Sequence, residues 1–261
     1  MVYSRHYIRS KLKSSRIVLR DPRLARYVPI TRKLRKSLLN DMLNQYEMVY
    51  VKPTRGQQGV GVIRVEKRGG GYSFRSGVKT YSFHTFQAMY RALKKRRGQR
   101  SYVVQKGIRM LKYRRRPFDF RVMIQKKRRG PWIVTGTLAR LAHPRKAVTN
   151  GSQGGTIYPA YGLMRRIAGK RGAKRLLYKM KRMAKRTAVQ FGRVYPSRGL
   201  GIDIAVDHKL KPWILEVNTR PDPCPFTKLP SKKMIRRILS VARGYGKRYS
   251  LHCTKAKRGR L

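Results

Sequence analysis

Two apolar runs toward the C-terminal end each have an acidic residue in their interior, and they restrict the fold more than any other feature. The runs read GLGIDIAVD (199–207) and KPWILEVN (211–218), with a short polar connection between them. Aliphatic, β-branched runs joined so closely predict a β-hairpin. Asp203 and Glu216 each have an aliphatic residue on both sides. Both carboxylates therefore belong to strands that are otherwise apolar.

A hairpin would bring these two acids together. An unpaired buried carboxylate is costly, so each acid needs a cation nearby. Asn218 lies two residues beyond Glu216 and so on the same face of its strand. Two carboxylates and one amide oxygen form an all-oxygen site, which suits magnesium bound to phosphates. The alternative is that each acid pairs with an arginine, of which the chain has many.

The chain is extremely basic. Its 261 residues include 67 Lys and Arg against 9 Asp and Glu, a formal net charge of +58. Self-repulsion of this size favours an anionic partner, such as nucleic acid, an acidic protein or an anionic polymer. The alternative is adaptation of the whole surface to an ionic environment. No zinc-finger spacing, heptad array or aromatic RNA-binding signature accompanies the charge, so it indicates a class of partner without a mode of recognition.

Composition also indicates where the protein works. The hydrophobic fraction of 40% is ordinary for a globular protein, and the length suits one large domain or two small ones. No apolar run approaches the roughly 20 residues of a membrane helix, and the N-terminus lacks the apolar core of a secretory signal. Two cysteines, Cys224 and Cys253, are too few for a disulfide framework. We expect a cytoplasmic protein with both thiols free.

Local patterns predict an α+β protein with mostly antiparallel strand pairs. Thr31 would cap the first helix, whose inner face would include Leu34, Leu38 and Met42. The expected helices lie at 31–45, 82–96, 173–192 and 231–246. The expected strands, besides the hairpin, lie at 47–53, 59–68, 71–74, 79–83, 101–108, 118–127 and 131–142.

A glycine-rich loop, TRGQQG, follows Lys52 and lies between two expected strands. Gly56, Gly59 and Gly61 would let backbone amides close over a phosphate. The loop is not a Walker loop, because the Gly-Lys-Ser/Thr end is missing and a strand follows. Taken alone, ordinary turn chemistry is the simpler explanation of these glycines.

These pieces in this order resemble the ATP-grasp fold, and more closely its YheC/YheD-type family of endospore coat-associated proteins. DFR, TNGSQGG and LEVN also look like the glutathione-synthetase and ribosomal-protein glutamate-ligase branch. The matching stretches cover about residues 27–225 and read YVPITRKL, VYVKPTRGQQGVGVIRV, YVVQKGI, PFDFRVMIQKKRRGPWIVTGTLARLA, VTNGSQGG and GIDIAVDHKLKPWILEVNTRPDP.

The resemblance implies two α+β subdomains whose antiparallel sheets enclose a nucleotide cleft. We expect residues 1–30 to be a basic segment joining the core, which begins almost at the start of the chain. Residues 31–107 would form the smaller subdomain with the glycine-rich lid. Residues 108–261 would form the larger one, with the metal site and a closing helix.

The resemblance further implies a carboxylate–amine ligase that uses ATP and Mg²⁺. The γ-phosphoryl group of ATP would pass to a substrate carboxylate, and an amine would attack the resulting acylphosphate. The basic surface would suit an acidic peptide or an anionic polymer as substrate. The alternative is a catalytically reduced scaffold that binds nucleic acid or an anionic spore layer. Either reading allows association with the spore of an endospore-forming bacterium.

Site residues follow from the resemblance by position. Lys52 would contact the ATP phosphates, under a mobile lid at Gly56–Gly61, and Lys11 or Lys13 would supply a second nucleotide lysine. Asp203, Glu216 and Asn218 would hold the magnesium ions. Three residues would stabilise the transferring phosphoryl group: Arg121, Arg140 and Asn150. Adenine would be bound by the backbone of an edge segment, formed by Gln105, Lys106, Gly107 and Ile108.

Overall fold

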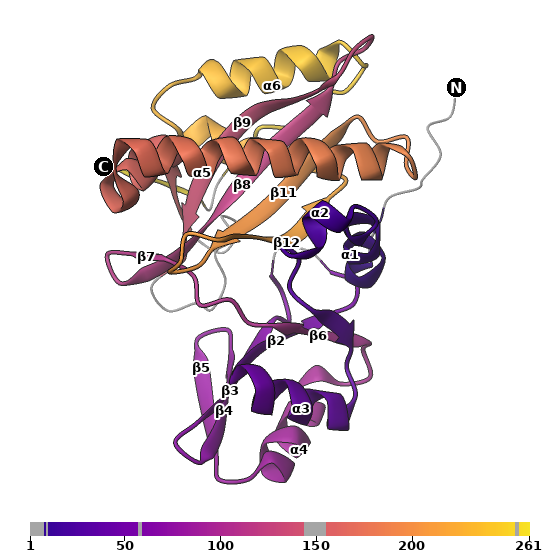
Figure 1. Ribbon diagram of the computed structural model, residues 1–261, viewed down its shortest axis with the longest axis vertical. Helices are drawn as coiled ribbons and strands as arrows, with labels where there is room; N and C mark the ends of the chain where they lie inside the picture. Colours follow the sequence, from indigo (N-terminus) through magenta and orange to yellow (C-terminus); the bar gives the residue numbers. More distant parts are fainter. Residues whose placement is uncertain (1–7, 9, 57–58, 144–154, 254–255) are drawn as a thin grey trace.

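The computed structural model describes residues 8, 10–56, 59–143, 155–253 and 256–261. The strands form two separate sheets, and helices pack against each of them (Figure 1). All the strand pairs described are antiparallel except that of β10 with β13. The α+β architecture with antiparallel sheets is therefore confirmed.

The smaller sheet has six strands in the order β1-β6-β2-β3-β4-β5. Helices α3 (Lys36–Tyr46) and α4 (Phe86–Arg97) pack against it, and Leu39, Met89 and Phe74 lie in the hydrophobic core between them. The strands are β1 (Thr31–Lys33), β2 (Met48–Pro53), β3 (Ile63–Arg68), β4 (Gly71–Ser76), β5 (Lys79–Phe83) and β6 (Tyr102–Lys106).

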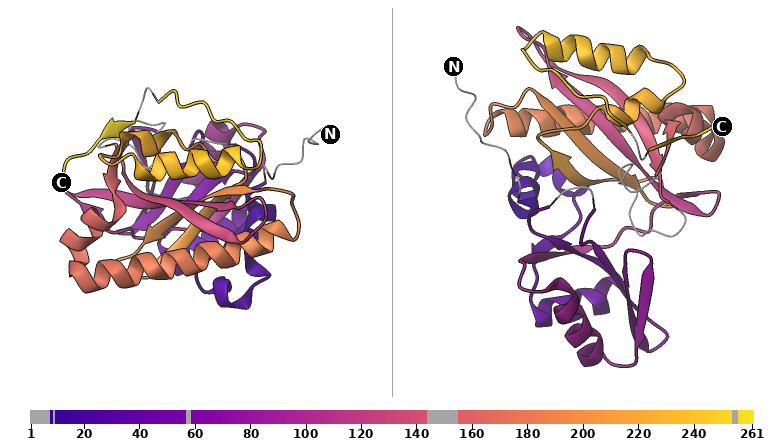
Figure 2. Two further views of the ribbon diagram at one scale, coloured as in Figure 1. Left: turned by 90° about the horizontal axis from the view of Figure 1, so that it is seen from above. Right: turned by 180° about the vertical axis from the view of Figure 1, so that it is seen from behind.

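The larger sheet has the order β12-β11-β8-β9-β10-β13, and β7 pairs with β8 outside this path. Helix α5 (Ala160–Gly192) covers one face, while α6 (Lys233–Arg243) and the 3-10 helix η2 (Cys224–Lys228) lie on the other (Figure 2). The strands are β7 (Lys112–Tyr113), β8 (Arg116–Lys126), β9 (Trp132–Leu141), β10 (Thr156–Pro159), β11 (Gly199–Val206), β12 (Pro212–Asn218) and β13 (Lys257–Arg258).

Alternation along β8 positions the site. Phe118 and Phe120 belong to the core cluster under α5, whereas Met123 belongs to the cluster under α6. Side chains on a strand alternate between faces, so Asp119 and Arg121 share the face of Met123. Neither residue belongs to the apolar cluster there. This part of the α6 face is therefore available for polar chemistry.

The N-terminal part of the chain packs on the larger sheet. Helices α1 (Lys11–Leu19) and α2 (Pro22–Ala25) precede β1 and contact α5. Ile17, Val18 and Leu24 are buried in the core cluster under α5. These helices thus lie beside the larger sheet although the smaller sheet follows them directly in the sequence (Figure 1).

The prediction for residues 31–45 is wrong at its start. Residues 31–33 form β1, which pairs with β6, and helix α3 begins only at Lys36. Thr31 does not cap the helix, because its hydroxyl donates to the Pro29 carbonyl. Pairing with a distant strand overrides the local helical pattern. The fully buried residues of α3 include Met42, as expected, whereas Leu34 and Leu38 pack only partly against the core.

The helix expected at 173–192 is longer than predicted. Helix α5 begins at Ala160 and is interrupted at Gly169, whose φ of 68° and ψ of 176° are not helical. Helices α4 and α6, and the strands of the hairpin, form close to where they were expected. Within the part of the chain described, no helix is long and apolar enough to cross a membrane.

Candidate functional site

The β11–β12 hairpin brings the two acids together as expected. Asp203 is paired directly with Glu216, and Gly201 with Asn218. A bulge follows Asp203, where the register shifts before Ile204. The Asn218 side-chain amide donates to the Gly201 carbonyl over 3.4 Å. Its side-chain oxygen accepts no hydrogen bond from the described residues, so it remains available to a ligand.

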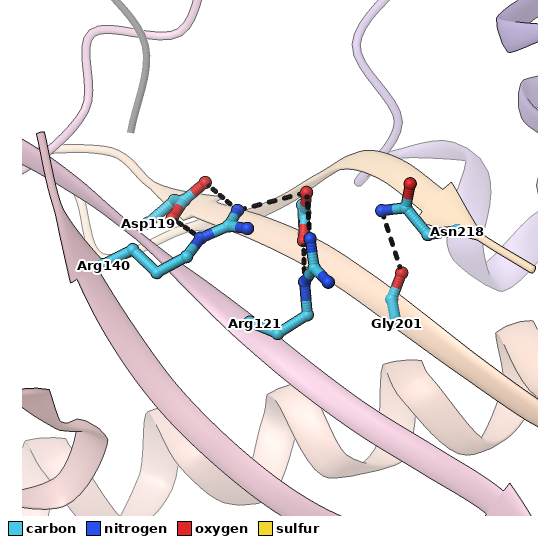
Figure 3. A network of polar contacts seen from close by, with 6 residues as sticks. Asp119, Arg121, Arg140, Gly201 and Asn218 are labelled. Atoms are coloured by element: carbon cyan, nitrogen blue, oxygen red, sulfur yellow. Dashed lines mark hydrogen bonds and ion pairs between the residues drawn. The ribbon is translucent and has the colours of Figure 1, made fainter. Parts of the chain in front are cut away.

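Asp203 takes part in a network of four charges with Arg121, Arg140 and Asp119 (Figure 3), of which all but the partly buried Arg121 are buried. Arg121 donates to both carboxylate oxygens of Asp203, from Nε to Oδ1 over 2.5 Å and from Nη2 to Oδ2 over 3.2 Å. Arg140 holds both oxygens of Asp119, over 2.8 and 2.6 Å. Its Nη2 also lies 3.1 Å from Oδ2 of Asp203. Arg140 therefore bridges the two carboxylates.

Register explains the network. Asp203 is the cross-strand partner of Arg121, and Asp119 is the partner of Arg140. Two arginines and two aspartates balance in charge, which compensates for their removal from water. Burial alone would raise the pKa of Asp203, but Arg121 and Arg140 hold it below its ordinary value. Burial alone would lower the pKa of Arg140, but Asp119 and Asp203 raise it.

The alternative that each acid pairs with an arginine is thus realised for Asp203. Glu216 differs, because it makes no hydrogen bond or ion pair with any described residue and is only partly buried. Among the neighbouring charges, the Glu216 carboxylate does most to raise the pKa of Lys52. One acid of the pair is therefore held by protein cations, and the other has free oxygens.

Lys52 extends from the smaller sheet toward this hairpin. A cavity between the sheets is lined by Lys52, Gln105 and Lys11 and, from β12, by Glu216 and Val217. Burial lowers the pKa of Lys52 to about 8, the Glu216 carboxylate opposes the fall, and Lys11 adds to it. The cavity thus combines two lysines and one unpaired carboxylate.

A chain of hydrogen bonds fixes Lys52. Its ammonium group donates to Oε1 of Gln105 over 2.6 Å, and Nε2 of Gln105 donates to the Thr31 hydroxyl over 2.8 Å. Gln105 and Thr31 are both buried. The sequence did not indicate this role for Thr31, because the strand that carries it has no local pattern of its own.

Of the two candidate N-terminal lysines, Lys11 lies at the cavity. Its Nζ donates to the Gly56 carbonyl over 3.2 Å, and its backbone amide donates to the Thr54 carbonyl over 3.0 Å. Lys13 instead points toward the ring of Tyr195, with Nζ 5.7 Å from the ring centroid. Helix α1 therefore begins against the glycine-rich loop.

The glycine-rich loop needs its glycines for backbone reasons. Gly56, Gly59 and Gly61 have φ values of 149°, 74° and 72°, a region that side chains other than glycine's rarely adopt. A Cβ on Gly61 would also lie 3.0 Å from Pro53 Cγ. The loop conformation suits a turn as well as a phosphate lid, so the lid function of residues 56–61 remains a prediction.

The hinge at residues 105–108 is not an edge segment, contrary to expectation. Strand β6 lies between β1 and β2, because residues 31–33 form the outer strand. The backbone amides of Lys106 and Gly107 already donate to the carbonyls of Ile30 and Met48. Ile108 lies just past the strand and is buried. Adenine binding at this hinge remains a prediction and would have to use groups other than these two amides.

The structure also shows where most of the other residues singled out in the sequence lie. Arg121 and Arg140 lie in the site and not on the surface. Asp119 is the partner of Arg140. Asn150 lies outside the described residues. Cys224 and Cys253 are free, as expected.

Asp203, Glu216 and Asn218 have the chemistry to hold magnesium. Carboxylate oxygens each carry two lone pairs, so Asp203 can accept another contact beside its arginines. Glu216 and Asn218 contribute oxygens that no described donor occupies. No group of three or more His, Cys, Asp or Glu that could hold a metal occurs among the described residues, here or elsewhere, so the donor set consists of two carboxylates and one amide. A hard, all-oxygen donor set matches magnesium.

Solved structures of other proteins share this fold. Biotin carboxylase from Campylobacter jejuni, in a β,γ-ATP complex, aligns with a TM-score of 0.54 at 15% identity, over 94% of this chain and 48% of that one. N5-carboxyaminoimidazole synthase from Aspergillus clavatus, with ADP and 5-aminoimidazole ribonucleotide, aligns with a TM-score of 0.52 at 11% identity, over 82% and 45%. The fold is that of ATP-grasp enzymes.

Sequence comparison agrees. The endospore coat-associated protein YheD of Bacillus subtilis (strain 168) is 25% identical over 222 residues, which are 81% of this chain and 48% of that protein. The chain thus spans about half the length of this curated relative. Residues 2–248 match the family described as YheC/D-like ATP-grasp. The match extends over nearly the whole sequence, so the chain belongs to the YheC/D-like ATP-grasp family.

Proposed function

We propose that the protein is an ATP- and Mg²⁺-dependent carboxylate–amine ligase that acts through an acylphosphate. The observation that carries this proposal is that Glu216 and Lys52, which come from different sheets, line the same cavity. A free carboxylate beside Asn218 offers metal ligands, while a lysine held by Gln105 offers a phosphate contact. The related enzymes named above were solved with ADP or an ATP analogue, which supports nucleotide use here.

Each residue of the site has a role in the proposed reaction. Lys52 and Lys11 bind phosphate oxygens of ATP, and Glu216, Asn218 and Asp203 hold magnesium, which supplies charge neutralisation at the phosphates. A substrate carboxylate oxygen forms a bond to the γ-phosphorus, and ADP leaves. An amine then forms a bond to the acyl carbon and loses a proton, while the bond from that carbon to the phosphate oxygen breaks and inorganic phosphate leaves.

Arg121 and Arg140 serve the anionic species of both steps. Their guanidinium groups are already positioned by Asp203 and Asp119, so they need little reorganisation when negative charge develops. Arg121 is the more accessible of the two, with 11% of its side chain exposed against 3% for Arg140. We infer that Arg121 contacts the reacting groups and that Arg140 positions Asp203.

An acidic peptide or anionic polymer is the substrate class that we propose. A cavity of about 460 Å³ lies at the end of the hairpin, where Arg220, Lys247 and Arg248 contribute to its lining. Gly199, which also lines it, is four residues from Asp203 on β11, a distance of roughly 13 Å. An extended acidic substrate could reach the phosphoryl group while its remaining charges occupy this cavity.

A magnesium-dependent assay of ADP release with glutamate-rich peptides tests this function. We expect release with the peptide, ATP and Mg²⁺ together, and a loss of at least 100-fold in Glu216→Gln, which removes a metal ligand with little change of shape. Asp41→Asn, at an exposed position on α3, is the matched control and should keep full activity. Release that is equal in Glu216→Gln would contradict the proposed site.

A second function, polyanion binding on a catalytically reduced scaffold, has one observation in its favour. Both oxygens of Asp203 already accept from arginines, so this part of the site is balanced in charge without a metal. Binding of a polyanion that survives Glu216→Gln, in a protein that releases no ADP with any acidic peptide, would favour this function. The name of the Bacillus subtilis relative supports association with the spore in both cases.

A further inference from the structure

The outer face of α5 is a row of cations. Helix α5 contains no Asp or Glu, and none occurs anywhere between Asp119 and Asp203. Leu176, Met180 and Met183 face the core, so the charged side chains point away from the larger sheet. The exposed cations after the interruption at Gly169, which we call the α5 ridge, include Lys170, Arg171, Lys174, Arg175, Lys181 and Lys185.

The ridge is long and lacks internal compensation. Lys170 and Lys185 are 15 residues apart, so the ridge extends about 22 Å along the helix. The members of the ridge form no ion pair with any described residue. Like charges four residues apart, as in Lys170 with Lys174 and Lys181 with Lys185, destabilise a helix. An anionic partner would relieve this repulsion.

An aromatic side chain lies within the ridge. Tyr178 is 62% exposed, the most of the large exposed hydrophobic residues. It lies four residues from Lys174 and four from Arg182, so all three share one face of the helix. The Arg182 guanidinium is 6.0 Å from the centroid of the Tyr178 ring. A ring held in water among cations is the arrangement on which unpaired bases stack.

We propose that the α5 ridge binds single-stranded nucleic acid, with phosphates on the lysines and arginines and a base on Tyr178. Among polyanions, this partner uses both features of the ridge, because a polyphosphate has no ring to stack and a duplex hides the faces of its bases. Helices α5 and α6 cover opposite faces of the larger sheet (Figure 2). The neighbours of Asp203 and Arg121 in sequence pack under α5, so strand alternation puts Asp203 and Arg121 on the face opposite the ridge. The proposal is therefore independent of the ligase function.

The local origin of binding is tested with two triple variants that lose the same charge. Lys174→Gln, Arg175→Gln and Lys181→Gln change the ridge, while Arg91→Gln, Lys94→Gln and Lys95→Gln change exposed positions on α4. Fluorescence anisotropy with a labelled 20-nucleotide oligothymidylate gives Kd at several salt concentrations. We expect the ridge variant to bind at least tenfold more weakly, with a salt slope shallower by about 2. An equal loss in the α4 variant would overturn the proposal.

The base contact is tested at Tyr178. We expect Tyr178→Ala to weaken oligothymidylate binding about tenfold and to leave binding of inorganic polyphosphate of equal charge unchanged. Tyr178→Phe keeps the ring and should restore the affinity. If Tyr178→Ala has no effect, or if polyphosphate or duplex DNA binds as tightly as the single strand, the assignment to single-stranded nucleic acid is wrong. Thermal unfolding of each variant verifies that it folds.

Discussion

Arg121 holds both carboxylate oxygens of Asp203 from the neighbouring strand, at 2.5 and 3.2 Å. The two residues are direct cross-strand partners on β8 and β11. This pairing makes Asp203 a fixed anion at the centre of the site, and Arg140 reinforces it from β9. The hairpin partner Glu216 has no such cation among the described residues, so the two acids of the hairpin have different surroundings.

Neutralising Asp203 should destabilise the fold. Asp203→Asn leaves Arg121 and Arg140 with an uncompensated buried charge, and we expect a loss of about 3 kcal/mol in the free energy of unfolding. The measurement is urea unfolding of the purified protein. Asp41→Asn, the exposed control, should change stability by less than about 0.5 kcal/mol. Similar small effects in both variants would show that the network contributes little to stability.

Lys52 should make stability depend on pH in a known direction. Its pKa is about 8 in the fold against an ordinary value of 10.5. Burial of the charged ammonium group therefore lowers the free energy of unfolding by its full amount below pH 8. This penalty disappears as the pH rises to 10.5, so the unaltered protein becomes more stable over this range. The stability of Lys52→Met relative to the unaltered protein should fall by up to about 3 kcal/mol over this range.

The control for this pH series is Lys94→Met, at an exposed position on α4. It should alter the free energy of unfolding by less than about 0.5 kcal/mol at every pH. A difference between Lys52→Met and the unaltered protein that stays constant from pH 7 to pH 10.5 would mean that Lys52 titrates normally in the fold.

Gly201 should tolerate no side chain, because it makes room for Arg121. A Cβ at this position would lie 2.9 Å from Pro221 Cβ and 3.1 Å from Nη1 of Arg121. We expect Gly201→Ala to cost about 1–3 kcal/mol of stability and to lower ADP release further by displacing Arg121. Gly130→Ala, whose nearest neighbour would be 3.4 Å away, is the control. Equal behaviour of the two variants would argue against close packing at Gly201.

The sequence was sufficient for features that depend on local pattern. The segment 199–218 has aliphatic strands and a short turn, a pattern that predicts a hairpin with Asp203 close to Glu216. The strand register confirms that these two residues are cross-strand partners. Features that depend on distant pairing were missed. Strand β1 has only three residues and exists because β6 accepts it. Because β1 forms, α3 starts later than predicted, and Gln105 lies on an inner strand and not at the edge of the sheet.

Two other features of the structure were also not predicted: the early start of α5 and the pairing of Asp119 with Arg140. The first part of α5 contains Gly162, Gly169 and Gly172, which weaken the helical pattern from Ala160 onward. The pairing of Asp119 with Arg140 depends on the register of β8 with β9, which no short motif specifies. The proximity of Asp203, Glu216 and Asn218 could be predicted because they share one hairpin, whereas the arginine network joins three strands.

The most direct test of the proposed ligase is to trap its acylphosphate. Hydroxylamine intercepts an acylphosphate as a hydroxamate, so the protein is incubated with ATP, Mg²⁺, a glutamate-rich peptide and hydroxylamine. We predict a peptide hydroxamate that forms in step with ADP and is lost in Glu216→Gln. ADP formed without hydroxamate, or hydroxamate formed equally by Glu216→Gln, would contradict the account.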